Sequence, residues 1–192
     1  MKLQLVLASQ SPRRSEILQA AGIAFTIRVP QVQVEEIRQP GEPPLQYVRR
    51  LATEKAAAVN LEPGEVILGA DTVVVYEGHV LEKPRDAHDA LRMLSLLNGR
   101  EHDVITGICL RTQTESIVDT DITRVRFSQL TRQEITGYIA SGEPTGKAGA
   151  YAIQGLASKF IERIDGSYSN VVGLPVALVY KVLRSAGDLV AD

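Results

Sequence analysis

Two adjacent arginines, Arg13 and Arg14, lie at the expected start of a helix, directly after Pro12. Proline suits the first helical position, where the backbone N–H groups are free and carry partial positive charge. A cation in that first turn costs a few tenths to about 1 kcal/mol, whereas a bound anion reverses the sign. A phosphate chain bound by N–H groups, the Ser9 and Ser11 hydroxyls and two guanidinium groups would explain the arrangement. The alternative is that both arginines point into water or pair with carboxylates.

Asp71 interrupts an apolar run, Val66–Val75, which otherwise has the character of a strand buried on both faces. An ionised carboxylate there loses hydration worth several kcal/mol unless a cation, a metal ion or several donors replace the water. The position therefore favours a metal ligand or a general base. Gly69 and Ala70, directly before it, would let a ligand approach closely. The alternative is an aspartate in a turn at the strand end, or one in a structural ion pair.

Three further charged positions are individually weak signals. Lys55 falls on the apolar stripe of an expected helix, where it either keeps its ammonium group in water or contacts a phosphate. Lys83 is by itself typical of a surface lysine. Glu35 and Glu36 form an acidic pair of the kind that is usually solvated.

The stretch Gly146–Gly155 is rich in small residues, too long for a turn and poorly suited to a helix. Backbone passing close to a ligand would explain this composition. Gln154 lies in the stretch, and its amide offers one acceptor and two donors that match the edge of a uracil or thymine ring. The alternative is that Gln154 only bonds a loop.

Apolar patterning predicts alternating strands and helices along the chain. Period-2 or continuous apolar runs predict strands, and stripes with helical spacing predict helices. The expected strands are Leu3–Ala8, Val66–Val75, Val104–Leu110, Ser116–Phe127 and Lys159–Ile164. The expected helices begin at Pro12, near Leu45, after Asp86, after Thr131 and at Pro175.

Local signals at the helix ends and one turn sharpen this prediction. Asp86 is a typical N-cap, and Thr131 with Glu134 forms a capping box. Residues 76–79 have the character of a hairpin turn, which requires an antiparallel pair. We therefore expect the α/β class, with a mixed twisted sheet and flanking helices.

Bulk properties exclude several classes of protein. A net charge of −2 and a pI near 6.0 argue against a nucleic-acid-binding surface. The single cysteine, Cys109, excludes disulfide frameworks and cysteine metal clusters, and it fits a reducing compartment. The chain shows neither a basic leader nor an apolar stretch of the roughly 20 residues needed to span a bilayer. We expect a soluble, cytoplasmic protein without a membrane partner.

Other catalytic classes are also disfavoured. His79, His88 and His102 lie far apart without the spacing of zinc ligands. Acyl transfer by a serine triad is disfavoured because the chain has no Gly-x-Ser-x-Gly elbow. The three histidines are interpreted as surface or structural residues.

Several long motifs, in the same order, resemble the Maf family of nucleotide pyrophosphatases, also called septum formation inhibitor proteins. The resemblance covers nearly the whole chain. It rests on residues 8–14 (Ala-Ser-Gln-Ser-Pro-Arg-Arg), 69–74 (Gly-Ala-Asp-Thr-Val-Val), 82–84 (Glu-Lys-Pro), 146–155 (Gly-Lys-Ala-Gly-Ala-Tyr-Ala-Ile-Gln-Gly) and 166–175 (Gly-Ser-Tyr-Ser-Asn-Val-Val-Gly-Leu-Pro).

The resemblance implies a single domain over residues 1–192, with two lobes around a central cleft, similar to the inosine triphosphate pyrophosphatases. It also implies a homodimer and a requirement for Mg²⁺ or Mn²⁺. It places the proton acceptor at Asp71 and supporting catalytic residues at Glu36, Lys55 and Lys83. We expect Asp71 and Glu36 to bind the metal ion, with Glu35 as the alternative to Glu36.

The resemblance further places substrate selection at Arg13, Thr72 and Gln154, positions that separate the branch acting on dTTP and UTP from the branch acting on 7-methyl-GTP. The chain resembles the first branch. We therefore expect a nucleoside triphosphate diphosphatase that hydrolyses dTTP and UTP, or modified pyrimidine nucleotides, to the monophosphate and pyrophosphate. Two alternatives stay open: a nucleotide-binding regulator of cell division without catalysis, and an enzyme of the same fold acting on modified purine triphosphates.

Overall fold

The computed structural model describes residues 3–30 and 34–185, in which seven strands form one sheet of order β2-β1-β3-β5-β6-β7, with β4 paired to β3 outside this path. β1 (Gln4–Leu7) is parallel to β2 (Thr26–Ile27) and to β3 (Glu65–Tyr76), whereas β4 (His79–Leu81) is antiparallel to β3. The sheet is therefore mixed, as the sequence predicted.

The chain divides into two compact units, and the long strands β3, β5 (Glu101–Arg111) and β6 (Ser116–Phe127) contribute to both. Unit 1 comprises Met1–Asp71, Thr106–Asp121 and Gly173–Asp192, and unit 2 comprises Thr72–Ile105 and Ile122–Val172. The expected domain includes residues 1–2, 31–33 and 186–192, which lie outside the described part of the chain. The cleft expected between two lobes stays a prediction.

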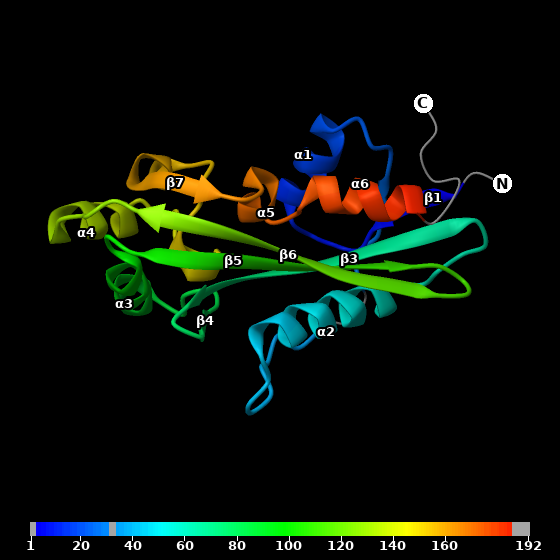
Figure 1. Ribbon diagram of the computed structural model, residues 1–192, viewed down its shortest axis with the longest axis horizontal. Coiled ribbons are helices and arrows are strands. Elements are labelled where there is room, and N and C mark those ends of the chain that lie inside the picture. Colours follow the sequence, from blue (N-terminus) through cyan, green and yellow to red (C-terminus); the bar gives the residue numbers. More distant parts are fainter. Residues whose placement is uncertain (1–2, 31–33, 186–192) are drawn as a thin grey trace. The chain divides into compact units, whose positions relative to one another are not determined.

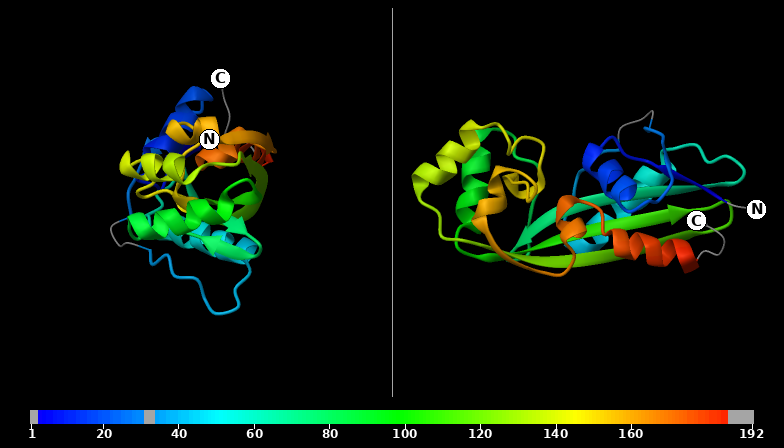
Figure 2. Two further views of the ribbon diagram at one scale, coloured as in Figure 1. Left: turned by 90° about the vertical axis from the view of Figure 1, so that its left-hand side faces the viewer. Right: turned by 90° about the horizontal axis from the view of Figure 1, so that it is seen from above.

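Unit 1 is a layer of strands covered by helices on both faces (Figure 1). α1 (Pro12–Ala20) and α6 (Val176–Ser185) cover one face, where Leu18 and Val179 share a core cluster with Leu7 and Leu68. The right-hand view of Figure 2 shows both helices on the viewer's side of the strands. α2 (Pro44–Ala57) covers the opposite face through small apolar side chains, among them Ala52 and Ala56.

α2 lies unusually close to the strands beneath it, and two glycines allow this. A Cβ at Gly69 would lie 2.2 Å from the Ala52 carbonyl oxygen, and one at Gly107 would lie 2.4 Å from the Val48 carbonyl oxygen. Real Cβ atoms do not approach backbone so closely, because the overlap forces the neighbours apart. Gly69 therefore fixes the distance between α2 and β3, two residues before Asp71.

Unit 2 packs α3 (Ala87–Leu97) and α4 (Arg132–Ala140) side by side (Figures 1 and 2). The remaining elements are two 3₁₀ helices, η1 (Ala148–Ala150) and η2 (Leu156–Phe160), strand β7 (Ile161–Asp165) and the short helix α5 (Tyr168–Val172). They share one apolar core with β3, β5 and β6, in which Leu94, Phe127 and Tyr151 are buried.

Most of the predicted end signals are confirmed. Asp86 caps α3 by accepting from the Asp89 N–H, and the capping box of Thr131 and Glu134 is complete. The predicted hairpin joins β3 to β4, with Glu77 and Gly78 at φ values of 48° and 77°. Positive φ at both central positions is the geometry that matches the twist of a two-residue hairpin.

Some details differ from the sequence prediction. The expected strand Lys159–Ile164 begins later, at Ile161, because the residues before it form η2, which turns Ala157 and Phe160 into the core. α5 and β2 were not predicted. The helix predicted to begin near Leu45 begins at Pro44, and Leu45 itself is 40% exposed. Within the described residues, no helix has the length and apolar character to cross a membrane.

Candidate active site

Asp71 lies in β3 and is 6% exposed, so the predicted burial of this carboxylate is confirmed. Burial raises its pKa above the ordinary aspartate value, although the charges of Lys55 and Arg14 oppose that effect. A carboxyl group whose pKa is raised toward neutrality is better matched to accepting a proton from water than an exposed one. The site thus contains a buried candidate base with two cations close to it.

The Lys55 ammonium group joins two carboxylates. Its Nζ lies 2.5 Å from Asp71 Oδ1 and 2.6 Å from Glu36 Oε1. The side chain is 15% exposed, so the ammonium group is directed to these carboxylates rather than out to water. Like charges on the two carboxylates would repel each other without it. Lys55 therefore compensates the charge of Asp71, and the predicted phosphate contact of Lys55 stays a prediction.

Glu36 is the member of the acidic pair that contacts Lys55, whereas Glu35 is exposed. The segment after Glu36 is fastened to α2 by Arg50. Its guanidinium donates to both carboxylate oxygens of Glu42, at 2.8 and 2.9 Å, and to the Ile37 carbonyl oxygen at 3.0 Å. A bidentate guanidinium–carboxylate pair is among the stronger and more directional contacts in proteins. α2 thus supplies Lys55 and also positions the carboxylate on the other side of it.

The two arginines at the start of α1 have different settings. Arg14 is 9% exposed and donates from Nε to the Gly173 carbonyl oxygen at 2.9 Å and from Nη1 to the Ala70 carbonyl oxygen at 2.8 Å. Nη1 also lies 3.3 Å from Ser9 Oγ. Burial lowers the pKa of Arg14, and the charges of Asp71 and Glu36 oppose this. Arg14 therefore ties the middle of β3 to α1, with positive charge facing the two carboxylates.

Arg13 and Ser11 are partly exposed at the first turn of α1. Ser11 is the N-cap residue, and its hydroxyl makes no capping hydrogen bond in the described structure. The buried Ser9 hydroxyl accepts from the Ser11 N–H at 3.1 Å. The structure thus brings Ser9 and Arg14 together, and phosphate binding by Ser9, Ser11, Arg13 and Arg14 stays a prediction.

Three predicted residues belong to unit 2. Thr72 follows Asp71 in β3 and is half-buried, whereas Lys83 and Gln154 are exposed. Their roles in catalysis and substrate selection stay predictions.

Sequence reasoning missed two side chains that connect distant backbone segments, Arg50 and Asn170. Arg50 had a detectable signal, since Glu54 lies four residues later on the same helix and accepts from it at 3.1 Å. Asn170, fully buried at the end of unit 2's chain, donates to the Val104 carbonyl oxygen at 3.0 Å. Its partners lie 66 and 47 residues away in sequence, so no local pattern indicates them.

Asp71 and Glu36 offer a donor set that suits a magnesium or manganese ion sharing its ligands with a substrate. Both residues provide hard carboxylate oxygens, and Mg²⁺ is commonly bound by one or two carboxylates plus phosphate oxygens and water. Among the described residues, no group of three or more His, Cys, Asp or Glu side chains forms a metal site of the protein alone. The oxygen atoms of the two carboxylates therefore fit a hard divalent ion.

The fold and the lysine-bridged carboxylates define an α/β protein with an acidic, cation-compensated site. The HAM1 protein from Coxiella burnetii has a similar fold, with a TM-score of 0.50 and 15% identity over 95% of this chain and 99% of that one. The chain belongs to the family of Maf-like proteins, which it matches over residues 4–186. The predicted family and fold class are confirmed.

Close relatives support the family assignment. A dTTP/UTP pyrophosphatase from Koribacter versatilis (strain Ellin345) is 50% identical over 186 residues, which cover 96% of this chain and 95% of the relative. A protein of the same name from Anaeromyxobacter dehalogenans (strain 2CP-C) is 51% identical over 97% of this chain and 96% of its own.

Proposed function

We propose that this protein hydrolyses dTTP and UTP to the nucleoside monophosphate and pyrophosphate. Relatives that match it over nearly their full lengths at about half identity carry that activity in their names. The observation that carries the proposal is the buried carboxylate of Asp71, bound by Lys55 beside Glu36. A charge is retained in an apolar strand at a cost of several kcal/mol, which is typical of a residue that works on a substrate.

In the proposed reaction Asp71 accepts a proton from a water molecule that attacks the α-phosphorus. A new phosphorus–oxygen bond forms from water, and the bond from the α-phosphorus to the bridging oxygen breaks. The electron pair stays on that oxygen, and pyrophosphate leaves. Lys55 keeps Asp71 in its charged form before the transfer by compensating its charge. Arg14 holds the middle of β3 at Ala70, directly before Asp71, and adds positive potential near the phosphate chain.

Charge builds on the phosphate oxygens during this step, and the cations around the site stabilise it. Arg13 at the first turn of α1, with the free N–H groups there, is suited to the same task. Lys83 adds a further cation in the proposal. A bound Mg²⁺ or Mn²⁺ ion, held by Asp71 and Glu36, would supply a Lewis acid to the phosphate oxygens.

Choice of the base is assigned in the proposal to Gln154, supported by Arg13 and Thr72. The Gln154 amide can donate to one ring carbonyl oxygen and accept from the ring N–H of a thymine or uracil. Cytosine presents a different pattern of donors and acceptors on that edge, so it would leave the Gln154 amide wrongly paired and be discriminated against. The proposal also includes a homodimer working in the cytoplasm, and light scattering of the purified protein tests the dimer.

The test is a panel of triphosphates with purified protein, run with Mg²⁺, with Mn²⁺ and with a chelator. The panel contains dTTP, UTP, dCTP, dATP, dGTP, 7-methyl-GTP and modified purine triphosphates. We expect pyrophosphate and monophosphate from dTTP and UTP, dependent on the metal ion. In ¹⁸O-labelled water the label should enter the monophosphate, because water attacks the α-phosphorus.

Each contrary result would lead to a different conclusion about function or mechanism. Nucleotide binding without turnover would replace the proposal by a regulator. Preference for modified purines would move the chain to another substrate class. Label in pyrophosphate would place the attack at the β-phosphorus and overturn the proposed role of Asp71.

A further inference from the structure

Glu143, which follows α4, binds several groups of unit 2 with one carboxylate. Oε1 accepts from the Tyr138 hydroxyl at 2.9 Å, and Oε2 accepts from the Leu156 N–H at 2.9 Å. The Ala157 N–H also donates to Oε1, at 3.4 Å. Burial opposes ionisation of Glu143, but these hydrogen bonds outweigh it and lower its pKa. The carboxylate thus joins α4 to the backbone at the start of η2.

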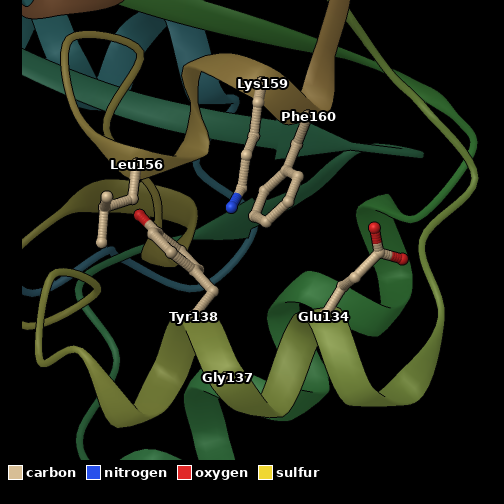
Figure 3. A pocket seen from close by; sticks show the side chains of 6 residues that line it. All are labelled: Glu134, Gly137, Tyr138, Leu156, Lys159 and Phe160. Carbon is tan, nitrogen blue, oxygen red and sulfur yellow. The ribbon is translucent and has the colours of Figure 1, made fainter.

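Tyr138 extends this network to the other side of the same segment. Its hydroxyl accepts from the Ala152 N–H at 3.3 Å while it donates to Glu143. The ring is 4% exposed and packs edge-on against Phe160, with centroids 5.5 Å apart. Figure 3 shows the Tyr138 side chain rising from α4 with its hydroxyl toward Leu156. Both residues line a pocket of about 190 Å³. The hydroxyl is therefore held by packing as well as by hydrogen bonds.

Glu143 and Tyr138 bind the backbone on both sides of Gln154. They bind the backbone N–H groups of residues 152, 156 and 157, so the chain is fastened two residues before Gln154 and two residues after it. Gly155 completes the fit, because a Cβ there would lie 2.2 Å from Glu143 Oε2. A turn within the segment, from the Gly155 N–H to the Ala152 carbonyl oxygen at 3.2 Å, fixes its path further. Gln154 itself is exposed.

We propose that Glu143 and Tyr138 are positioning residues that fix Gln154 for selection of the base. The proposal rests on the proposed function, in which Gln154 reads the edge of thymine or uracil. In this proposal neither residue touches the substrate. An amide that must donate and accept at once discriminates between bases only when its position is correct to about 0.5 Å and its orientation to about 10 to 20°. The network supplies that restraint through backbone contacts on both sides of Gln154.

The test compares Glu143→Gln and Tyr138→Phe with Gln154→Ala. Glutamine keeps the shape of Glu143 but has one acceptor oxygen, and its NH₂ group faces a donor that the carboxylate satisfied. Phenylalanine keeps the ring packing on Phe160 and removes the hydroxyl alone. Glu162→Gln and Tyr168→Phe are the matched controls, because both side chains are exposed in unit 2.

Two readouts are needed. The first is the ratio of kcat/KM for dTTP to that for dCTP, which we expect to fall about 10- to 100-fold in both variants, as expected for a misplaced substrate-positioning group. The second is hydrogen exchange of the segment 150–158, which should become faster in both variants. Tyr138→Phe removes the acceptor of the Ala152 N–H, and Glu143→Gln removes one of the two oxygens that accept from Leu156 and Ala157. Tyr138→Phe should affect Ala152 most directly. The controls should change neither readout.

A double variant distinguishes a positioning role of Glu143 from a general effect on stability. The double variant Glu143→Gln with Gln154→Ala should lose no more selectivity than Gln154→Ala alone, because the network acts through that amide. Losses that multiply, or an unchanged ratio despite faster exchange, would overturn the positioning role. Should Glu143→Gln fail to fold, the same comparisons with Tyr138→Phe decide the matter.

Failure of the proposed function is a different result. Wild-type protein that releases no pyrophosphate from any triphosphate would overturn both proposals together. Wild-type protein that prefers dTTP and UTP, with variants that keep its preference, would overturn only the role of Glu143 and Tyr138.

Discussion

Lys55 Nζ lies 2.5 Å from Asp71 Oδ1 and at nearly the same distance, 2.6 Å, from Glu36 Oε1. One ammonium group thereby joins a strand of the sheet, helix α2 and the segment that precedes α2. Arg14 also faces these two carboxylates, so two positive charges compensate the two negative ones. Asp71 can thus remain charged although it is buried in the strand.

The first prediction concerns the proposed base. Asp71→Asn keeps the size of the side chain but cannot accept a proton, so we expect kcat to fall by about 10² to 10⁴, the usual contribution of a general base. The circular dichroism spectrum and the thermal transition should remain those of a folded protein. Pyrophosphate release under single-turnover conditions measures the effect.

The control for Asp71→Asn is Asp103→Asn, a strand aspartate paired with Arg124 at the surface. That variant should retain wild-type turnover. Purified Asp71→Asn protein with a near-normal kcat would rule out Asp71 as the proton acceptor.

The second prediction concerns the charge that Lys55 compensates. Lys55→Gln leaves Asp71 and Glu36 next to each other without a cation, and removing one partner of a buried pair costs up to about 3 to 5 kcal/mol. The partial exposure of Glu36 reduces this, so the lower part of that range is expected. Denaturant unfolding measures the loss.

Magnesium should restore part of the stability lost in Lys55→Gln, because the ion can bind both carboxylates in place of the ammonium group. Lys181→Gln, at an exposed position of α6, is the matched control. A variant whose midpoint does not respond to millimolar Mg²⁺ would argue against a shared metal site at Asp71 and Glu36.

The third prediction compares two glycine-to-alanine changes with opposite expected signs. Gly69→Ala places a methyl group 2.2 Å from the Ala52 carbonyl oxygen and 2.7 Å from the Ala56 backbone nitrogen. α2 must move away from β3, at a cost of about 1 to 3 kcal/mol. Turnover should fall as well, because α2 carries Lys55.

Gly137→Ala serves as the control for this change. A Cβ there meets nothing within 4 Å, and the residue lies inside α4. Alanine should therefore stabilise the protein by up to about 1 kcal/mol through the helix preference. Equal stability of the two variants in denaturant would contradict the close approach of α2 to the sheet.

The sequence predicted those features whose signals lie close together in the chain. Asp71 was detectable because one charge interrupts ten consecutive strand residues, and the caps of α3 and α4 depend on residues three positions apart. The role of Lys55 stayed open, because its partners lie 19 and 16 residues away. Arg14 donates to backbone carbonyl oxygens of residues 159 and 56 positions away in the sequence. Because every residue has such a carbonyl group, the residue types do not indicate these partners. Such tertiary contacts leave no pattern in a single sequence.

The fourth prediction concerns acid stability and His102, which lies in β5 and is 3% exposed. Its Nε2 lies 2.8 Å from the Tyr151 hydroxyl, and its ring meets Phe127 edge-on with centroids 5.2 Å apart. Burial in this apolar cluster lowers the pKa of His102 from 6.5 to about 3. The folded protein therefore keeps the imidazole neutral at a pH where the unfolded chain protonates it.

The sign of the pH effect follows from this difference in proton binding. Between pH 6.5 and about 3 the unfolded state binds one more proton at His102 than the folded state does. The free energy of unfolding should thus fall as the pH falls through that window, with a slope from this residue of up to about 1.4 kcal/mol per pH unit. Above pH 6.5 the contribution is constant.

His102→Gln, which can still reach the Tyr151 hydroxyl but does not titrate, should flatten the curve in this window. Urea unfolding at pH 4, 5, 6 and 7 measures the slope, and His88→Gln at an exposed position controls for the exchange of residue type. Parallel curves for wild-type and His102→Gln protein would mean that His102 takes up its proton in the folded state near its ordinary pKa. That result would contradict the lowering of its pKa by burial.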